Sequence, residues 1–252
     1  MTDKIAIITG ASRGLGRSMA LHLAARGVGI VGTYRTGNAE AATLKQEIEA
    51  KGGKAAMIAL DVTDIASFPA FRETVTRTLR EDFGRERFDH LVNNAGIGLG
   101  ASFTETTEEQ FDALVNTHLR APIFLTQKLL PMMEDGGHIL NVSSGFVRFT
   151  IPGYSVYAAM KGAIEVLTRF MAVELGNRRI RVNAIAPGAI ATDFAGGVVR
   201  DNQEVQAFVA QGIALGRVGL PDDIGAAVAA ILSDELGWAN GTSFDISGGQ
   251  ML

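Results

Sequence analysis

The chain has 252 residues, of which 47% are apolar and 20% are charged, and its formal net charge is −4. This composition is ordinary for a globular protein, and the acidic balance gives no electrostatic attraction to nucleic acid or anionic lipid. The sequence has no cysteine, which excludes disulfides, thiolate catalysis and cysteine zinc sites. No apolar run reaches the roughly 18 residues of a membrane span, and we expect a cytoplasmic protein.

Short β-branched runs alternate with helical patterns along the whole chain. The runs lack polar alternation, which is typical of strands buried on both faces. Their order predicts an α/β fold: one Rossmann-type, doubly wound domain over residues 1–252, with a seven-stranded parallel sheet and helices on both faces. The predicted strands are 5–9, 29–34, 54–60, 89–94, 138–143, 180–186 and 243–247. The predicted helices are 15–26, 39–51, 67–82, 108–133, 155–176 and 222–234.

A glycine-rich turn, TGASRGLG, joins the first predicted strand to the first helix. Its glycines are Gly10, Gly14 and Gly16. Glycine permits a tight turn and lets the backbone approach a pyrophosphate, and the helix N-terminus offers free N–H groups to that pyrophosphate. The turn therefore indicates a dinucleotide-binding site.

The end of the second predicted strand, GTYRTGN, bears on which nicotinamide cofactor binds. A carboxylate at this point would accept from the adenosine 2′-hydroxyl and repel a 2′-phosphate. The first carboxylate in this region is Glu40, inside the next helix, and Arg35 stands near the strand end. Arg13 in the glycine turn is a second cation, and the guanidinium fork suits a phosphate. We therefore expect NADP(H) in preference to NAD(H), although both arginines could instead be solvated surface charges.

Small and polar residues follow several of the predicted strands. Asp61 ends the third strand and either accepts from an adenine amino group or caps the following helix. The fourth, fifth and sixth strands end in NNAG, NVSSG and APG. Because parallel strands end at one edge of the sheet, these residues are expected to gather where open α/β sheets bind ligands.

The stretch GYSVYAAMKG contains Tyr154, Tyr157 and Lys161 at the start of the fifth predicted helix. Ser155 is expected to cap that helix. Tyr157 and Lys161 are four positions apart and share a helical face. An adjacent ammonium favours the phenolate, so we expect Lys161 to lower the pKa of Tyr157. Tyr154 has no such partner, and Tyr157 is the predicted acid–base residue.

Taken together, these motifs resemble those of the short-chain dehydrogenase/reductase family, and the resemblance covers essentially the whole chain. Within that family, the sequence resembles members such as 3-oxoacyl-[acyl-carrier-protein] reductases and glucose dehydrogenases. The motifs that carry the resemblance are TGASRGLG, NNAG, LVNTH, NVSSG, YAAMK, APGAIATD and SGGQML, which occur in the family's order. Ser144 precedes Tyr157 by thirteen residues, as in the family.

The resemblance implies a role for each catalytic residue. Tyr157 would protonate the carbonyl oxygen, and Ser144 would hold that oxygen, whereas the adjacent Ser143 is one residue out of place. Lys161 would bind the nicotinamide ribose and act on the tyrosine pKa. Asn116 would anchor a water of a proton relay, although a helix-interior asparagine bonded to backbone is the alternative.

The resemblance also implies a set of cofactor-binding residues, and no metal. The expected set is Gly10, Ser12, Arg13, Gly14, Leu15, Gly16, Arg35, Asp61, Val62, Asn94, Ala95, Gly96, Tyr157, Lys161, Pro187, Gly188, Ile190 and Thr192. The four histidines, at positions 22, 90, 118 and 138, form no zinc-ligand spacing. His118 follows Asn116 by two positions and is expected to point elsewhere on its helix, in a structural or interfacial role.

A substrate pocket is expected beside Tyr157. Its predicted residues are Leu99, Phe146, Arg148, Tyr154 and Phe194. For Phe146, ordinary core packing is the alternative. Arg148 could meet an anionic substrate group or pair across a subunit interface. Residues 193–217 break the regular rhythm and are predicted to form a lid, with an ordinary surface excursion as the alternative.

The predicted function is NADP(H)-dependent hydride transfer between nicotinamide and a carbonyl or secondary alcohol, in a ketone or 3-oxoacyl reductase. A sugar, polyol or alcohol dehydrogenase uses the same residues in the opposite direction. A nucleotide-binding regulator without catalysis is the alternative from another class. Family members are often tetramers, so a homotetramer, or else a homodimer, is expected, with a small-molecule substrate as the other partner.

Overall fold

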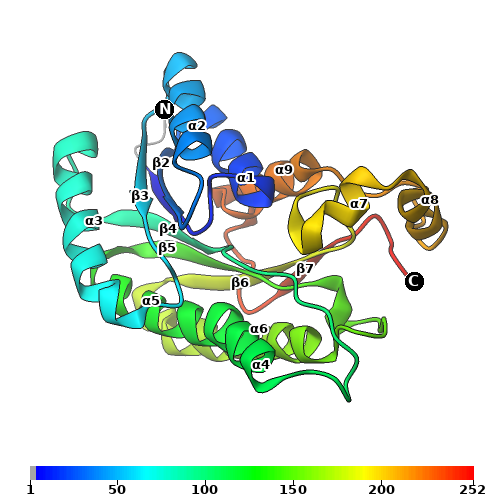
Figure 1. Ribbon diagram of the computed structural model, residues 1–252. Helices are drawn as coiled ribbons and strands as arrows, with labels where there is room; N and C mark the ends of the chain where they lie inside the picture. Colours follow the sequence, from blue (N-terminus) through cyan, green and yellow to red (C-terminus); the bar gives the residue numbers. More distant parts are fainter. Residues whose placement is uncertain (1–3) are drawn as a thin grey trace.

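Seven parallel strands form one sheet in the order β3-β2-β1-β4-β5-β6-β7. The computed structural model describes residues 4–252. This order, with helices on both faces (Figure 1), confirms the predicted Rossmann-type, doubly wound fold. The strands are β1 (Ile5–Ile8), β2 (Gly29–Tyr34), β3 (Ala55–Ala59), β4 (Phe88–Asn93), β5 (Met133–Val142), β6 (Arg181–Pro187) and β7 (Ser243–Ile246).

Two hydrophobic cores lie on the two faces of this sheet. One contains buried side chains of α1 (Gly14–Ala25), α2 (Asn38–Ala50) and α9 (Pro221–Ile231). The other contains side chains of α3 (Phe68–Phe83), α5 (Ala121–Leu129) and α6 (Ser155–Glu174). The central strands are buried almost completely, which explains their lack of polar alternation. Short 3₁₀ turns complete the chain: η1 (Ile65–Ser67), η3 (Leu130–Met132), η4 (Gly145–Val147), η5 (Gly176–Arg178), η6 (Phe194–Gly197) and η7 (Asp234–Leu236).

The predicted helix 108–133 is divided into parts. The structure has α4 (Glu108–Val115), a π-helical turn η2 (Asn116–Arg120) and then α5. In the π-turn the backbone N–H of Ala121 donates to the carbonyl of Asn116, five positions earlier. This wider turn rotates the side chains that follow relative to a continuous α-helix, and such turns occur often at functional sites.

Two boundaries differ from the sequence prediction. β5 begins at Met133, earlier than the predicted start at 138, because Met133 pairs with Phe88 before a shift in the register with β4. Ser155 is the first residue of α6 and not its cap; Tyr154 stands at the N-cap position without a side-chain capping bond.

The segment 193–217 contains η6, the single-turn helix α7 (Val198–Asp201) and α8 (Gln203–Gln211). It lies outside the two helical layers, on the side of the molecule where the C-terminus ends (Figure 1). Gly196 and Gly197 both have φ of 77°, a left-handed conformation that glycine adopts without strain. The predicted irregularity is therefore a chain of short helices joined by tight glycine turns.

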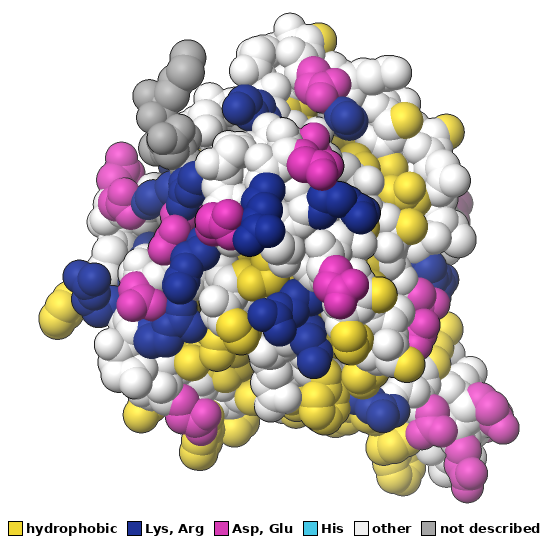
Figure 2. Space-filling model, turned by 90° about the vertical axis from the view of Figure 1, so that its left-hand side faces the viewer, with side chains coloured by type: hydrophobic (Ala, Val, Ile, Leu, Met, Phe, Trp, Pro, Cys, Tyr) yellow, Lys and Arg dark blue, Asp and Glu magenta, His cyan; other side chains and the backbone are white. Residues whose placement is uncertain are grey.

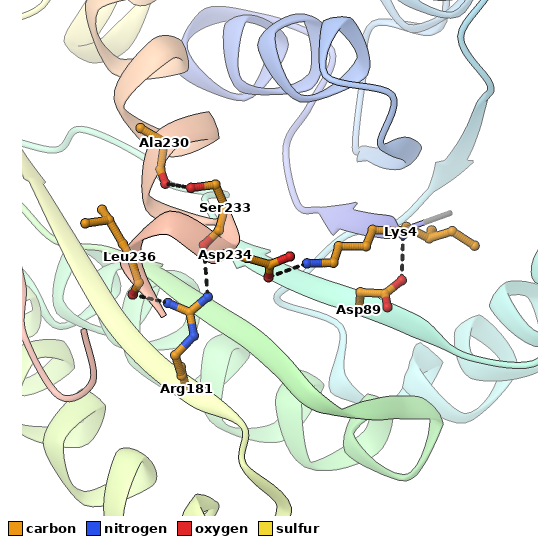
Figure 3. Close-up of polar contacts among 8 residues, drawn as sticks. Lys4, Asp89, Arg181, Ala230, Ser233, Asp234 and Leu236 are labelled. Carbon is orange, nitrogen blue, oxygen red and sulfur yellow. Dashed lines mark hydrogen bonds and ion pairs between the residues drawn. The ribbon is translucent and has the colours of Figure 1, made fainter. Parts of the chain in front are cut away.

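The sheet edge where the strands begin is fastened by polar contacts (Figure 3). Lys4 Nζ lies 2.6 Å from Asp234 Oδ1. Arg181 Nη1 donates to the carbonyl of Leu236 at 2.8 Å, and its Nη2 donates to the carbonyl of Ser233 at 3.3 Å. These contacts tie the segment after α9 to the beginnings of β1 and β6. The predicted ligand site lies at the other ends of the strands.

The surface on the α3 side of the molecule mixes Lys and Arg with Asp and Glu (Figure 2). At the end of α3, Arg80 Nη2 lies 2.8 Å from Glu86 Oε2. Such mixing is typical of a solvated surface. Within residues 4–252, no helix is long and apolar enough to cross a membrane.

Candidate active site

The glycine turn and the NNAG segment meet at the ends of β1 and β4, which are neighbours in the sheet. The hydroxyl of Thr9 accepts hydrogen bonds from the backbone N–H groups of Asn94 and Ala95, each at 2.9 Å. The Asn94 amide donates to the carbonyls of Thr9 at 2.8 Å and Gly10 at 3.1 Å. Chain connections diverge to the two faces of the sheet at this point, which is where such folds bind ligands. Thr9, which the sequence prediction did not single out, braces both segments.

The turn leaves the start of α1 open to a phosphate. A Cβ on Gly16 would collide with the carbonyl oxygen of Gly10, and Gly14 has φ of 54°, so both positions favour glycine. Arg13, at the N-cap position, makes no side-chain capping bond. The first N–H groups of α1 are therefore not satisfied by a cap, and they form an anion site that fits a dinucleotide pyrophosphate.

Arg13 and Arg35 are exposed, and neither makes an ion pair in the described part of the chain. By contrast, Arg17 on α1 pairs with Glu47. The Asp61 carboxylate accepts from the N–H of Thr63 at 2.9 Å and from its hydroxyl at 2.7 Å, in an Asx turn. The pKa of Asp61 is lowered: partial burial acts to raise it, but the Thr63 hydrogen bonds and the charge of Arg35 prevail.

The loop after β6 brings its predicted residues to the same edge. The N–H of Gly188 donates to Ile246 O at 3.2 Å, which anchors the loop to β7. Ile190 forms a parallel bridge with Gly219. Thr192 lies against Gly14 of the glycine turn. The structure therefore brings both halves of the predicted cofactor set together.

Tyr157 and Lys161 are buried in the first turns of α6, with 6% and 5% of their surface exposed. Lys161 Nζ donates to the carbonyl of Val142 at 2.7 Å and lies 5.6 Å from the centre of the Tyr157 ring. The end of β5 therefore holds the ammonium next to the phenol, as the helical spacing predicts.

The two serines after β5 point to different partners. Ser143 Oγ donates to Glu165 Oε1 at 2.8 Å, inside the contact between β5 and α6. The Ser144 side chain lies close enough to Tyr157 to act on its pKa, and it accepts from the N–H of Phe146 at 3.3 Å. Ser144 is thus the serine that the structure places beside the phenol.

The expected effect of Lys161 on Tyr157 is not what the structure shows. Burial raises the pKa of Tyr157, while the hydrogen bond with Ser144 acts in the opposite direction. Burial lowers the pKa of Lys161 to about 7. Removal from water disfavours both charged forms, and this effect exceeds the lowering predicted from the helical spacing. In this state the phenol is protonated at neutral pH.

His118 does not point away from the site as the sequence prediction had it, and the predicted water-anchoring role of Asn116 stays a prediction. Asn116 Oδ1 accepts from Arg120 Nη1 at 3.4 Å on the exposed side of η2. His118, predicted to point elsewhere, is buried, and its ring centre lies 5.2 Å from that of Tyr157, edge-on at 89°. The side chain that faces the predicted catalytic pair is therefore His118. The π-turn, which periodicity did not predict, is the local reason.

Several aromatic side chains lie next to the Tyr157 ring. The ring centres of Phe146 and Phe194 lie 6.1 Å and 5.7 Å from the Tyr157 centre. Tyr154 stacks at a tilt on Phe146, at 5.0 Å. Leu99 lines a hollow next to Tyr157. Four of the five predicted pocket residues therefore gather around the phenol.

Arg148 is the exception among the predicted pocket residues. Its Nη1 lies 2.7 Å from Asp245 Oδ2, and its Nη2 lies 3.5 Å from Ser247 Oγ. The guanidinium thus fastens η4 to β7 within this chain. Neither of the two expected partners, a substrate anion or a second subunit, is needed to explain its place.

Comparison with known proteins agrees with this geometry. A family model described as enoyl-(acyl carrier protein) reductase matches residues 10–251. Hydroxynaphthalene reductase-like protein Arp2 of Metarhizium brunneum is 34% identical over 262 residues, which cover 100% of this chain and 96% of that protein. A short-chain dehydrogenase/reductase from Serratia marcescens has a TM-score of 0.90 at 30% identity, over 99% of this chain and 98% of that chain.

The angucycline C-6 ketoreductase LanV with bound NADP has a TM-score of 0.94 at 36% identity, over 99% of this chain and 96% of that chain. A further LanV structure contains NADP and rabelomycin. Fold and site define an oxidoreductase with a Rossmann-type nucleotide site. This chain belongs to the short-chain dehydrogenase/reductase family, and the predicted family and reaction class are confirmed.

Proposed function

We propose that this chain reduces ketones on cyclic, aromatic compounds with NADPH. The observation that carries the proposal is the buried Tyr157 phenol, which has Ser144 and Lys161 beside it and the rings of Phe146 and Phe194 next to its own ring. A protonated phenol is suited to give a proton to a carbonyl oxygen, whereas alcohol oxidation needs the phenolate. The descriptions of the relatives as reductases favour the reductase over the dehydrogenase among the predicted functions.

The substrate class is supported by the walls of the site and by the relatives. Aromatic faces pack well against flat rings, in stacked or edge-on arrangements. The name of Arp2 refers to a hydroxynaphthalene, and LanV has been solved with rabelomycin. A polycyclic aromatic ketone therefore suits the Phe146, Tyr154 and Phe194 side better than a sugar does, because these side chains offer few polar partners.

NADPH, when bound, supplies the hydride. The residues of this chain do the rest. The glycine turn and the start of α1 would hold the pyrophosphate, with Asn94, Ala95, Ile190 and Thr192 along the rest of the cofactor. The Ser144 hydroxyl holds the substrate carbonyl oxygen, and Tyr157 gives that oxygen its proton as negative charge develops. The Lys161 ammonium, close to the ring, then stabilises the phenolate that remains.

A preference for NADP(H) over NAD(H) is part of the proposal. Arg13 is exposed in the glycine turn, and Arg35 is exposed just after β2. Within residues 4–252, no carboxylate forms an ion pair with either arginine. A 2′-phosphate would fill that role through charge-assisted hydrogen bonds. The NADP in the LanV complex is consistent with this preference.

The segment 193–217 is proposed as a lid over the substrate. Phe194, 41% exposed, is the second residue of the segment and already contacts the Tyr157 ring. The two consecutive glycines of the lid segment, Gly196 and Gly197, provide a hinge, because glycine tolerates large changes of φ. Closure would exclude water from the reacting carbonyl.

A homotetramer, with a homodimer as the alternative, is proposed from the exposed apolar side chains of α6 and the segment before β7. Phe170 and Val173 on α6 are 64% and 82% exposed, and Trp238 is fully exposed. Large exposed apolar side chains are typical of contact surfaces. Light scattering tests this: a monomer at micromolar concentration would reject it.

An NADPH-consumption screen tests the function. Its panel has 1-tetralone as a cyclic aromatic ketone, a 3-oxoacyl thioester and, in the reverse direction with NADP⁺, glucose. We expect the highest kcat/KM for 1-tetralone with NADPH. Faster reduction of NADP⁺ by glucose would favour the dehydrogenase, and no turnover with any substrate would favour the regulator.

A further inference from the structure

Residues 247–251, which follow β7, form a strap that contacts the end of the proposed lid. The backbone N–H of Ala214 donates to the carbonyl of Gly249 at 3.2 Å. The N–H of Met251 donates to the carbonyl of Gly212 at 2.8 Å. The strap therefore holds the end of the lid segment through backbone hydrogen bonds that do not depend on the identity of a side chain.

The side chain of Gln250, on this strap, contacts the loop after β6. Its Oε1 accepts from the backbone N–H of Ala189 at 2.8 Å, and the residue is only 5% exposed. A Cβ on Gly188 would lie 2.8 Å from the same oxygen, so the amide packs directly on the loop backbone. Because an N–H needs an acceptor, the amide oxygen and not its nitrogen faces Ala189. Gln250 is thus a buried polar side chain whose oxygen serves one backbone group of this loop.

The loop that Gln250 contacts continues into two of the proposed cofactor residues. Ale-adjacent Ile190 follows Ala189 directly, and Thr192 lies against the glycine turn. The carbonyl of Ala189 accepts from the N–H of Gly219 at 2.9 Å, while its N–H donates to Gln250. The peptide groups of Ala189 are therefore held from two sides, and a shift at Ala189 would displace Ile190 and Thr192 relative to the cofactor.

We propose that Gln250 is a positioning residue for hydride transfer: its amide oxygen fixes the loop 188–192 along the nicotinamide, and its backbone joins that loop to the end of the lid. The proposal rests on the proposed function, which places this loop along the cofactor. Gln250 also forms an antiparallel bridge with Ile213, at the end of the lid segment. Because one residue makes both contacts, closure of the lid and placement of the nicotinamide are linked.

Two substitutions of similar length isolate the amide oxygen. Gln250→Met keeps an unbranched side chain and removes the acceptor, so the N–H of Ala189 loses its partner. Gln250→Glu keeps an oxygen that accepts in either protonation state of the carboxyl group. Both variants retain the backbone hydrogen bonds between the strap and the lid. A difference between them therefore reports the contact with the loop and not the presence of the strap.

Calorimetric titration with NADPH and with 2′-phospho-ADP-ribose, which lacks the nicotinamide, tests the proposal without turnover. In Gln250→Met we expect the Kd for NADPH to rise about fivefold, near the low end of the effect of an unpaired N–H, and the Kd for 2′-phospho-ADP-ribose to stay within about twofold. The kcat for 1-tetralone reduction should fall about tenfold, because a small displacement of the reacting atoms slows the transfer. Gln250→Glu should restore most of both values.

The matched control is Met251→Ala, on the same strap. A Cβ on Gly212 would lie 3.0 Å from Met251 Sδ, so this side chain packs on the end of the lid. Met251→Ala should lower the thermal stability and leave the ratio of the two affinities unchanged. Equal weakening of both ligands in Gln250→Met would overturn the proposal, because it would show a general structural role. A Gln250→Glu variant as impaired as Gln250→Met would overturn it too.

Amide hydrogen exchange tests the link between the loop and the lid. In the wild type, NADPH should slow exchange of the amides of residues 212–215 several-fold, because these amides report local opening of the pairing with the strap. In Gln250→Met this slowing should be lost. Exchange that NADPH leaves unchanged in the wild type would overturn the link. A wild-type protein with the expected binding and exchange that reduces no ketone would refute the proposed function alone.

Discussion

Ser143 and Ser144 are consecutive residues with different surroundings: the Ser143 hydroxyl donates to Glu165, whereas the Ser144 side chain lies close enough to Tyr157 to lower its pKa. The backbone at the end of β5 is extended at Ser144, so the two side chains point in opposite directions. The two serines therefore have separable roles, one in packing α6 onto the sheet and one at the substrate oxygen.

Ser144→Ala should lower kcat about 10²-fold, as expected for one lost donor to a developing oxyanion. Ser143→Ala should lower the free energy of unfolding by about 1 kcal/mol, the value of one hydrogen bond, and leave kcat within about twofold. Steady-state kinetics and urea unfolding of both variants check this pair. If Ser143→Ala is the variant that loses turnover, Ser143 and not Ser144 is the serine at the substrate oxygen.

Arg35→Ala should raise the KM for NADPH about tenfold and leave the KM for NADH unchanged, because a charge-assisted hydrogen bond to a 2′-phosphate contributes about 1.5–3 kcal/mol. Titration of wild type and variant with both cofactors measures it. Arg72→Ala is the control, since Arg72 is an exposed cation on α3, away from the site. Equal NADPH affinities in wild type and Arg35→Ala would contradict the assigned phosphate contact.

Phe194→Ala should raise the KM for 1-tetralone several-fold, since one aromatic contact contributes about 0.5–1.5 kcal/mol. Phe208, 75% exposed on α8, lies on the same segment and serves as the control. Phe208→Ala should leave the KM within about twofold, as surface substitutions usually do. Similar values for both variants would argue against Phe194 as part of the substrate wall.

Acid should destabilise the protein through its buried histidines. Burial lowers the pKa of His90 to about 3 and the pKa of His138 well below its usual range. The unfolded chain binds protons on these groups below about pH 6.5, so stability is complete above that pH and is lost as the pH falls toward 3. We expect the free energy of unfolding to decrease by about 1 kcal/mol or more per pH unit in that window.

His90→Leu should reduce that slope, which urea unfolding at pH 7.0 and 5.0 measures. Val92→Ala, on the same strand and the same face as His90, is the control: it removes packing and should lower stability equally at both pH values. A slope in His90→Leu equal to that of the wild type would show that His90 is not a source of the acid sensitivity.

Much of the fold could be predicted because its signals are local. Runs such as IAII and GIVGTY are buried on both faces of the sheet, and Gly14 and Gly16 stand where a side chain would be strained or would collide. The spacing of Tyr157 and Lys161 on one helix fixed their contact. These features could be predicted because the residues that form them are close together in the sequence.

The predictions that failed depend on tertiary structure. Helical periodicity placed His118 away from the site, because a π-turn is not visible in an α-helical pattern. The role of Asn116 came from the family resemblance and stays a prediction. The partner of Arg148 is Asp245, far along the chain, and no spacing rule connects the two residues. The pKa of Tyr157 was predicted from its charged neighbour alone, whereas burial decides its direction.

The central claim is that Tyr157 gives the proton during ketone reduction with NADPH. Stopped-flow measurement of NADPH oxidation by Tyr157→Phe, mixed with 1-tetralone, tests it most directly. The substitution keeps the ring among Phe146, His118 and Phe194 and removes only the hydroxyl. We predict NADPH binding as in the wild type, with the oxidation rate lowered at least about 10²-fold, as expected for the loss of a general acid. Oxidation at the wild-type rate would contradict the claim.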